Sequence, residues 1–240
     1  MASQPNTSPI LYQEWCNLLF LHWEIDPKLI RPIIPDSLTI DTFNNSAWIG
    51  IIPFQMKNLR PRFLLPLNSI SNFTEINLRT YVVDRNNRKG VWFFSLDTQN
   101  SLGNWIAQKF FHLNYRFAKT EFKNDSISKH SCSVVYPNSK IHEQRFKWRD
   151  SKTTFMPSSN SDSLEFFLTE RYRLFSYNKR KRILLTGSIR HEPYVLNRPE
   201  LEEYSTGLFN TNGFELNIEH PNSILASKGT KVAVYKLERV

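Results

Sequence analysis

The chain has 240 residues, with 31 Lys and Arg against 22 Asp and Glu, which gives a formal net charge of +9. Aromatic residues make up 14% of the chain while Gly occurs only 7 times, which excludes a disordered protein and indicates a globular core of large rings. We expect a single domain over residues 1–240, because this length suits one core and no stretch has the composition of a long linker.

The two cysteines, Cys16 and Cys132, lie far apart and form no Cys-x-x-Cys motif. The sequence therefore predicts reduced thiols, with neither a disulfide framework nor a zinc site, and we expect no metal and no cofactor. The apolar run at residues 18–21 is too short to span a bilayer and lacks the flanks of a signal peptide. We expect a cytoplasmic protein with no membrane partner, and the sequence leaves its oligomeric state open.

The first unit of the chain is predicted to be a strand followed by a short helix. Residues 18–23 are an apolar run typical of a buried strand. Asp26 and Pro27 then match the N-cap and first position of a helix that extends through Ile34 and ends at Pro35.

Three successive strands are expected next. Residues 47–54 and 73–83 are β-rich apolar runs, and turn residues at 86–90 connect the second run to a strand over residues 91–97.

A helix is then expected to begin at Ser101 and to lay one apolar face on the sheet. Its apolar residues recur at helical spacing: Leu102, Trp105, Ile106 and Phe110. Strands are predicted after it over residues 115–122, 131–136 and 144–148. In the last of these, Gln144, Phe146 and Trp148 alternate with Arg145, Lys147 and Arg149. This alternation predicts a strand with one solvated face.

The last third of the chain is predicted to combine short helices with strands. Asp162 and Glu165 have the spacing of a capping box, so a helix is expected from Leu164 after the polar loop at 157–163. The basic run at 179–182 lies between two strand-like segments, the second over 183–189, and is interpreted as a solvated hairpin tip. A capped helix over residues 199–209 and a strand over residues 230–237 complete the prediction.

Six short segments of the chain carry a resemblance to a known family: residues 19–23, 47–50, 75–82, 90–97, 167–172 and 191–194. The strings Glu-x-Asn-x-Arg-Thr-Tyr-Val and Leu-Thr-Glu-Arg-Tyr are the most specific of them. In this order they resemble the YqjF-like family of uncharacterised bacterial proteins, which has the fold of acetoacetate decarboxylase. The resemblance implies an α+β, β-rich fold: a closed or nearly closed antiparallel β-barrel or sandwich with a few flanking helices. It implies no known reaction.

The same resemblance predicts that the chain is not a Schiff-base decarboxylase. Acetoacetate decarboxylase places its reactive lysine just after a Gly-x-Pro that follows a helix, and the matching stretch here is residues 112–115. Tyr115 stands at the lysine position, and without an amine no imine can form. Lys109 and Lys119 are near in sequence but do not match the motif. If the chain is an enzyme, we expect a lyase-like activity related by fold alone.

One predicted strand has two different faces. Glu75, Asn77, Arg79 and Tyr81 share one face by the two-residue repeat, while Ile76, Leu78, Thr80 and Val82 share the other. From the pattern alone, the polar face is either a solvated ladder or the lining of an internal pocket. The resemblance favours the pocket, because the decarboxylase-like fold places a glutamate in its pocket at a comparable strand. An enclosed Glu75 is expected to pair with an arginine, either Arg79 or Arg171.

Two further candidates lie near the end of the short helix and in the next strand. Glu170 and Arg171 could join Glu75 and Arg79 in an ion network that is either structural or part of a site. His191 is a candidate acid or base, although a lone histidine, like His22, is more often structural.

Two hypotheses of function remain, because no phosphate loop, zinc-protease motif or nucleophile elbow occurs. The favoured one is a small-molecule binding protein, or an enzyme of unestablished reaction, with an internal pocket for an organic ligand such as a carboxylate held by Arg79. Its ligand-binding candidates are Glu75, Asn77, Arg79, Tyr115, Glu170, Arg171 and His191. The alternative is a basic interaction module that binds nucleic acid or another acidic partner through residues 179–182 and the 145–149 stripe. It is disfavoured because these residues lack the interleaved, exposed aromatic side chains that proteins binding single-stranded nucleic acid use.

Overall fold

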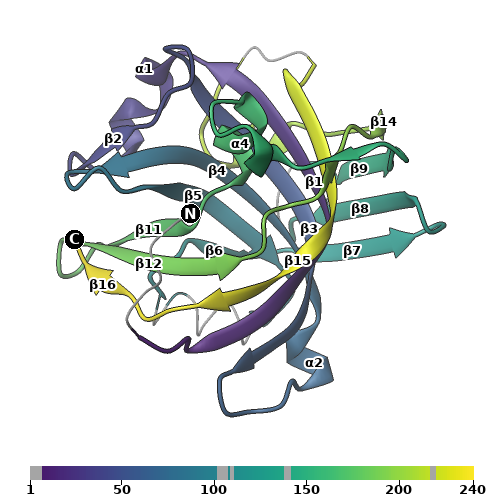
Figure 1. Cartoon of the computed structure of the whole chain (residues 1–240), viewed down its shortest axis with the longest axis horizontal. Coiled ribbons are helices and arrows are strands. Elements are labelled where there is room, and N and C mark those ends of the chain that lie inside the picture. Colours follow the sequence, from purple (N-terminus) through teal and green to yellow (C-terminus); the bar gives the residue numbers. More distant parts are fainter. Residues whose placement is uncertain (1–6, 102–107, 109–110, 138–141, 217–219) are drawn as a thin grey trace.

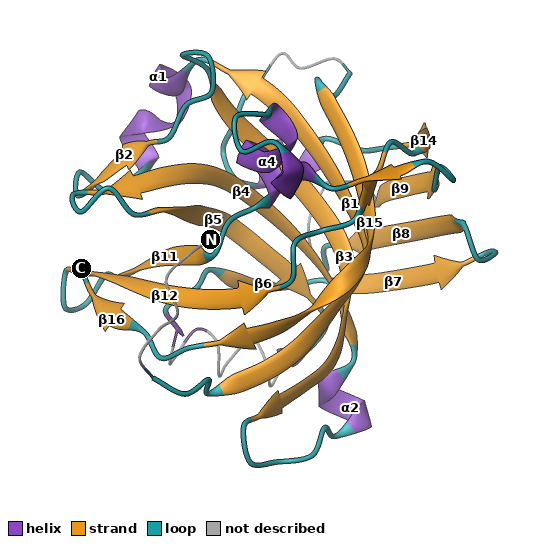
Figure 2. Ribbon diagram, viewed as in Figure 1, coloured by secondary structure: helices purple, strands orange, loops and turns teal. Residues whose placement is uncertain are grey.

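A computed structural model describes residues 7–101, 108, 111–137, 142–216 and 220–240 of the chain. Strands dominate it, and the helices are short (Figure 2). The main sheet contains β1 (Leu11–Ile25), β2 (Leu38–Ile40), β3 (Ala47–Pro61), β4 (Phe73–Asp84), β5 (Lys89–Thr98), β6 (Tyr115–Phe117), β10 (Thr154–Phe155), β11 (Arg173–Asn178), β12 (Ile183–His191), β13 (Leu196–Asn197), β15 (Ser223–Val234) and β16 (Glu238–Arg239). A second, antiparallel sheet contains β7 (Lys119–Asn124), β8 (Lys129–Val135), β9 (Gln144–Arg149) and β14 (Glu200–Glu203). The helical segments are α1 (Pro27–Ile30), η1 (Arg31–Ile33), α2 (Asn68–Ser71), η3 (Pro157–Ser159), α4 (Leu164–Thr169) and α5 (Gly207–Thr211).

The main sheet curves back on itself. Its strands follow the order β15, β1, β3, β4, β5, β11, β12, and β12 pairs again with β15, where Ile189 lies opposite Val234 (Figure 1). Most pairs are antiparallel, but β5 pairs in parallel with both β11 and β6. The prediction of a β-rich fold with a nearly closed sheet and few helices is confirmed.

A bulge in β1 contributes to this curvature. Asn17 adopts a φ of 51°, and the register between β1 and β3 shifts between Cys16 and Leu21, so β1 bends there. Opposite the bend, Gly229 has a φ of 125°, and a Cβ atom on it would lie 1.9 Å from the Trp15 carbonyl oxygen. Only glycine fits this close approach of the two backbones.

The curved sheet creates two separate buried spaces. Its outer face packs against the second sheet, where Leu78 of β4 joins Phe146 and Trp148 of β9 in one apolar cluster. The inner face encloses a different set of residues, among them Tyr81 of the same strand. Most residues on both faces of β4 are therefore buried, and the face that carries Glu75 and Asn77 belongs to the interior of the curved sheet.

Most predicted strands and turns are confirmed, and the predictions for two segments are wrong. Residues 199–209 are not one helix, because residues 200–203 form β14 beside the basic face of β9. There Glu203 forms an ion pair of 3.0 Å with Lys147. Local helix propensity takes no account of such a contact between residues far apart in the sequence. The segment 115–122 is two strands in different sheets, since the chain leaves the main sheet at Ala118.

Other predictions differ in detail. The N-cap of α4 is Ser163, whose hydroxyl accepts a hydrogen bond from the Phe166 amide, so the cap lies one residue after the predicted Asp162. The basic run at 179–182 does form the turn between β11 and β12. The helix predicted from Leu102 to Phe110 lies mostly outside the described residues. No helix in the described part of the chain is long and apolar enough to cross a membrane, and both cysteines are free.

Candidate functional site

The space inside the curved sheet contains an inner cavity of about 340 Å³. Its wall is mostly apolar and comes from the inward side chains of β1, β3, β4 and β5, with additions from β6, β11, β12 and β15. Four of the predicted site residues line it because they alternate inward on β4 or begin β6: Glu75, Asn77, Arg79 and Tyr115. The polar face of β4 thus lines a cavity rather than solvent.

Glu75 is the buried carboxyl group of this cavity, with 3% of its surface exposed. Its Oε2 atom accepts a hydrogen bond of 2.9 Å from the Tyr115 hydroxyl. Burial raises the pKa of Glu75 to about 7, against the lowering effect of hydrogen bonds from Tyr115 and Asn77. Near neutral pH this carboxyl group can therefore both accept and release a proton.

Arg79 lies further along β4 and is held by neutral oxygens. Its Nη2 donates to the Leu168 carbonyl oxygen at 3.0 Å and to the Tyr81 hydroxyl at 3.4 Å, while its buried Nε has no partner. The Tyr81 hydroxyl itself donates to Leu168 at 2.6 Å and lies 2.6 Å from Nε2 of His22. Burial lowers the pKa of His22 well below its usual value, so this histidine is a neutral, structural neighbour.

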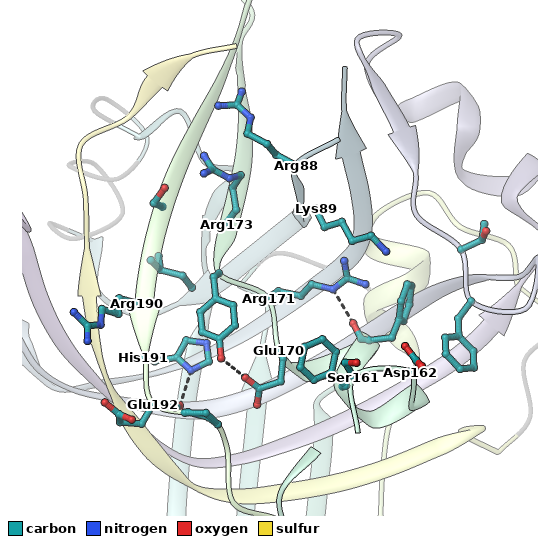
Figure 3. A pocket seen from close by; sticks show the side chains of 18 residues that line it. Arg88, Lys89, Ser161, Asp162, Glu170, Arg171, Arg173, Arg190, His191 and Glu192 are labelled. Atoms are coloured by element: carbon teal, nitrogen blue, oxygen red, sulfur yellow. Dashed lines mark hydrogen bonds between the residues drawn. The ribbon is translucent and has the colours of Figure 1, made fainter. Parts of the chain in front are cut away.

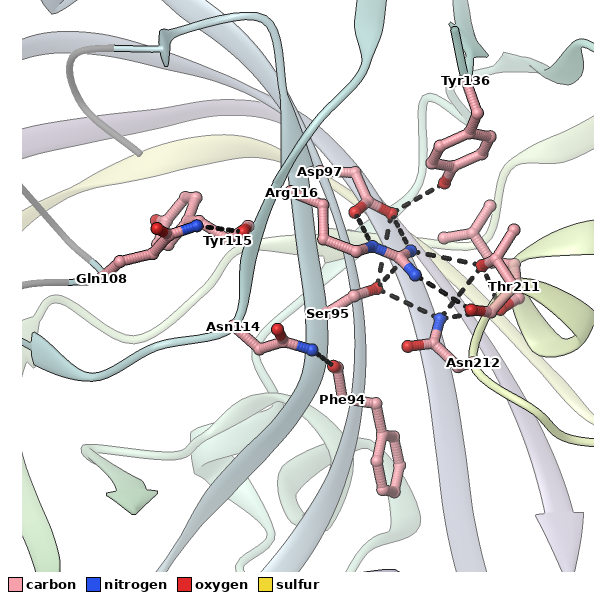
Figure 4. Close-up of polar contacts among 11 residues, drawn as sticks. Phe94, Ser95, Asp97, Gln108, Asn114, Tyr115, Arg116, Tyr136, Thr211 and Asn212 are labelled. Carbon is pink, nitrogen blue, oxygen red and sulfur yellow. Dashed lines mark hydrogen bonds and ion pairs between the residues drawn. The ribbon is translucent and has the colours of Figure 1, made fainter. Parts of the chain in front are cut away.

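A polar cluster on the opposite side of the sheet fixes the position of Tyr115 (Figure 4). Leu96 pairs with Tyr115 and Asp97 with Arg116 where β6 runs parallel to β5. Arg116 binds both oxygens of the fully buried Asp97, at 2.6 and 2.7 Å, and the Tyr136 hydroxyl donates to the same carboxylate at 2.7 Å. Because side chains alternate along a strand, anchoring Arg116 on one face directs Tyr115 to the cavity on the other.

A separate outer pocket of about 730 Å³ lies between α4, the start of β5 and the facing ends of β11 and β12 (Figure 3). Glu170 and His191 line this outer pocket, and Arg171 lines both spaces. The seven predicted site residues are thus divided between two adjoining spaces, and they do not form one cluster.

The carboxylate of Glu170 serves the architecture of the outer pocket. It accepts hydrogen bonds from the Tyr172 hydroxyl and, at 3.0 Å, from the Tyr194 amide. His191 stacks on Tyr172 with ring centroids 4.6 Å apart and donates from Nδ1 to the Glu192 carbonyl oxygen at 2.8 Å. Burial lowers the pKa of His191, and its buried Nε2 has no hydrogen-bond partner.

The predicted ion network among Glu75, Arg79, Glu170 and Arg171 is wrong. Arg171 pairs instead with Asp41 at 2.6 Å, and Glu75 binds Tyr115. The reason is geometric, because residues four apart on a strand are separated by roughly 13 Å, beyond the reach of a direct ion pair between Glu75 and Arg79.

Three residues that shape these spaces were not predicted from the sequence, namely Asp41, Asp97 and Arg116. The pairing between β5 and β6 brings Asp97 and Arg116 together, and no spacing in the chain signals a contact across 19 positions. The one available signal is that Arg116 directly follows Tyr115, because neighbouring side chains on a strand point to opposite faces of the sheet.

The lining of the inner cavity decides which nucleophiles and metal ligands are close to a bound molecule. No lysine of the described residues lines the inner cavity. Over the same part of the chain, no group of three or more His, Cys, Asp or Glu side chains is arranged to hold a metal ion. The Glu75 carboxyl, the Tyr115 hydroxyl and the Arg79 guanidinium are among the polar groups of the residues that line the inner cavity.

Solved structures with the same fold include acetoacetate decarboxylases. The one from Legionella pneumophila aligns with a TM-score of 0.69 at 12% identity, covering 100% of this chain and 91% of the other. An acetoacetate decarboxylase-like enzyme from Sphingomonas wittichii RW1 aligns with a TM-score of 0.64 at 10% identity, covering 98% and 94%. The enduracididine biosynthesis enzyme MppR, complexed with pyruvate, aligns with a TM-score of 0.63 at 10% identity, covering 97% and 91%. At these identities the similarity shows the fold alone.

Sequence comparison identifies the family. The chain is 35% identical over 221 residues to the uncharacterized protein YqjF of Bacillus subtilis strain 168, covering 91% of this chain and 88% of that protein. The profile of the DUF2071 family, described as an uncharacterized conserved protein (COG2071), matches residues 12–231. The predicted resemblance to YqjF is therefore confirmed, and the chain belongs to the DUF2071 family.

Proposed function

We propose that this protein binds a small, mostly apolar organic acid in the inner cavity, with the carboxylate at Arg79 and with Glu75 exchanging a proton near the other end of the ligand. A largely apolar wall with a few convergent polar groups is typical of sites for small organic molecules. The separation of Arg79 from Glu75 along β4 leaves room for the body of such a ligand between them.

The bonding of Arg79 is the observation that carries the proposal. No carboxylate of the described residues forms an ion pair with Arg79, and its buried Nε is unbonded. A guanidinium that faces an apolar cavity without a counter-ion is costly to bury. A ligand carboxylate would supply the missing charge and a second hydrogen bond.

Glu75 determines what kind of chemistry the site could support. Its raised pKa suits a group that takes or gives a proton near neutral pH, and Tyr115 can hold the resulting carboxylate through its hydroxyl. Tyr115 cannot form an imine with a carbonyl group, so any reaction here proceeds without a Schiff base at that position. One protein of the same fold, MppR, has been solved with pyruvate, which is consistent with an acid as the ligand.

Binding measurements on matched ligands and variants test the proposal. Calorimetry would compare pyruvate, hexanoate and phenylacetate with the corresponding amides, for the wild-type protein and for Arg79→Gln. We expect at least one acid to bind, its amide to bind about tenfold more weakly or worse, and Arg79→Gln to remove this preference. Arg145→Gln is the matched control, since Arg145 is exposed and lies on the second sheet. Equal losses in both variants would mean that only bulk charge attracts the acid.

A further inference from the structure

Three strands bring basic residues together at the outer pocket. Arg88 directly precedes β5 and Lys89 is its first residue, and β5 runs parallel to β11, with Val91 opposite Leu174. In the hairpin of β11 and β12, Arg173 lies opposite Ser188. Arg190 is two residues beyond Ser188 on the same face of that hairpin, which makes it the diagonal neighbour of Arg173.

The carboxylates around this pocket compensate only some of these charges. Asp84 pairs with Arg88 at 2.6 Å, and Asp41 takes both Arg171 at 2.6 Å and Lys89 at 3.5 Å. Arg173 and Arg190 form no ion pair with any carboxylate of the described residues, although Asp84 and Glu238 act on Arg173 from a greater distance.

Arg88 and Arg173 repel one another in this arrangement. Their side chains extend in the same direction from neighbouring strands (Figure 3). Burial and the nearby charge of Arg88 both lower the pKa of Arg173, whose side chain donates to the Thr186 hydroxyl at 3.2 Å. An anion placed between the two guanidinium groups would relieve this repulsion.

From these contacts we infer that the outer pocket is a second binding site, for a small organic phosphate, separate from the acid site of the inner cavity. Arg173 and Arg190, whose guanidinium groups have no ion pair among the described residues, match the charge of a phosphate monoester, which is close to −2 at neutral pH and offers three acceptor oxygens. Aromatic side chains of Phe43, Phe166 and Tyr172 line the same space and would pack against the organic part.

Two further observations concern the size of this site and its separation from the inner cavity. The pocket of about 730 Å³ is roomy enough for a phosphorylated metabolite. Arg171 lies between the two spaces and is held by Asp41 with only 6% of its side chain exposed. Arg171 therefore forms part of a fixed wall, and a ligand in one space need not displace a ligand in the other.

Titrations with phosphate probes test the inference on the intact protein. Phenyl phosphate, inorganic phosphate and benzoate would be titrated into wild type, Arg173→Gln, Arg190→Gln and Lys181→Gln. We expect phenyl phosphate to bind more tightly than benzoate, and Arg173→Gln to weaken it by about tenfold or more. Lys181→Gln removes the same charge at the tip of the same hairpin, where Lys181 is exposed, and should change the affinity less than twofold.

The controls keep the two sites distinguishable. Arg79→Gln should leave phosphate binding intact, and Arg173→Gln should leave acid binding intact. Equal weakening by Lys181→Gln and Arg173→Gln, or no weakening by Arg173→Gln, would overturn the phosphate site. Competition between phenyl phosphate and the inner-cavity acid would overturn the separation of the sites. Failure of acid binding with phosphate binding retained would contradict only the proposed function.

Discussion

At the scale of single residues, Glu75 links protonation to stability. Its pKa in the folded protein is raised from 4.5 to about 7, so the folded state holds a proton that the unfolded chain releases. This contribution to stability is fully present below about pH 4.5 and is lost as the pH rises through about 7. In Glu75→Gln the group no longer titrates.

We therefore predict that Glu75→Gln gains stability relative to wild type as the pH rises. The difference in the free energy of unfolding should change by about 3 kcal/mol in favour of the variant between pH 4.5 and pH 8, measured by urea denaturation at each pH. Glu121→Gln, at an exposed position on β7, should run parallel to wild type. Parallel curves for Glu75→Gln as well would mean that Glu75 is solvated and ionised throughout.

Tyr115 leads to a chemical prediction at the same scale. Borohydride reduction in the presence of acetoacetate or pyruvate should leave the mass of the wild-type protein unchanged, because a phenol forms no imine. Tyr115→Lys introduces an amine beside Glu75 and is the positive control, in which a trapped adduct is expected. A specific adduct on any lysine of the wild-type protein would contradict the absence of Schiff-base chemistry.

The sequence pattern predicted which polar side chains share a strand face better than it predicted the hydrogen-bond and ion-pair partners of those side chains. The two-residue repeat placed Glu75, Asn77 and Arg79 on one face of a strand, where Glu75 and Asn77 are buried and Arg79 is partly buried. The repeat could not predict that the Glu75 partner is Tyr115, 40 positions away, or that Arg171 binds Asp41 across 130 positions. Such contacts depend on strand order and register, which are properties of the assembled sheet.

At the scale of elements, β6 is a strand of three residues that depends on its polar anchor. It adds only three pairs to β5, and Arg116 binds Asp97 on the side away from the cavity. Asn114 and Gln108 add side-chain hydrogen bonds to the Phe94 and Tyr115 carbonyl oxygens. The position of the Tyr115 hydroxyl beside Glu75 therefore rests on contacts outside the cavity.

We predict that Asp97→Asn costs about 3 to 5 kcal/mol of unfolding free energy, because it removes the buried carboxylate from a pair whose arginine is itself mostly buried. Combining it with Arg116→Gln should recover part of the loss. Glu202→Gln, in the more exposed pairs between β14 and its neighbours, should cost about 1 kcal/mol or less. Chemical denaturation of the four proteins gives the comparison, and similar losses at both sites would contradict an anchoring role.

The strand β14 shows why local patterns fail at this scale. Proline followed by acidic residues is typical of a helix start, yet residues 200–203 extend along β9. The acidic side chains there face a basic strand, and Arg149 and Lys147 pair with Glu200 and Glu203. Partner charge on a neighbouring strand overrides a weak helical preference.

At the scale of the whole molecule, the net charge of +9 is distributed unevenly. The basic stripe of β9, which the sequence suggested as an interaction surface, is paired with acidic side chains: Arg145 with Glu143, Lys147 with Glu203, and Arg149 with Glu200 and Glu202. The tip between β11 and β12, at 179–182, is the other basic segment that the sequence suggested. Its four consecutive cations sit on one small turn rather than along a groove.

This distribution predicts weak, nonspecific attraction to nucleic acid. A few cations at one tip neutralise few phosphates, so binding to double-stranded DNA should weaken steeply with salt and be lost on a DNA column by about 0.2 M salt. Replacing residues 179–182 by glutamine should abolish the retention, while binding of the organic acid to the inner cavity stays unchanged because none of these four residues lines that cavity. Elution above about 0.5 M salt, or a preference for one DNA sequence, would instead favour a nucleic-acid function. The comparison needs only the wild-type protein, the quadruple variant and a salt gradient, with calorimetry of the acid as the check that the variant remains folded.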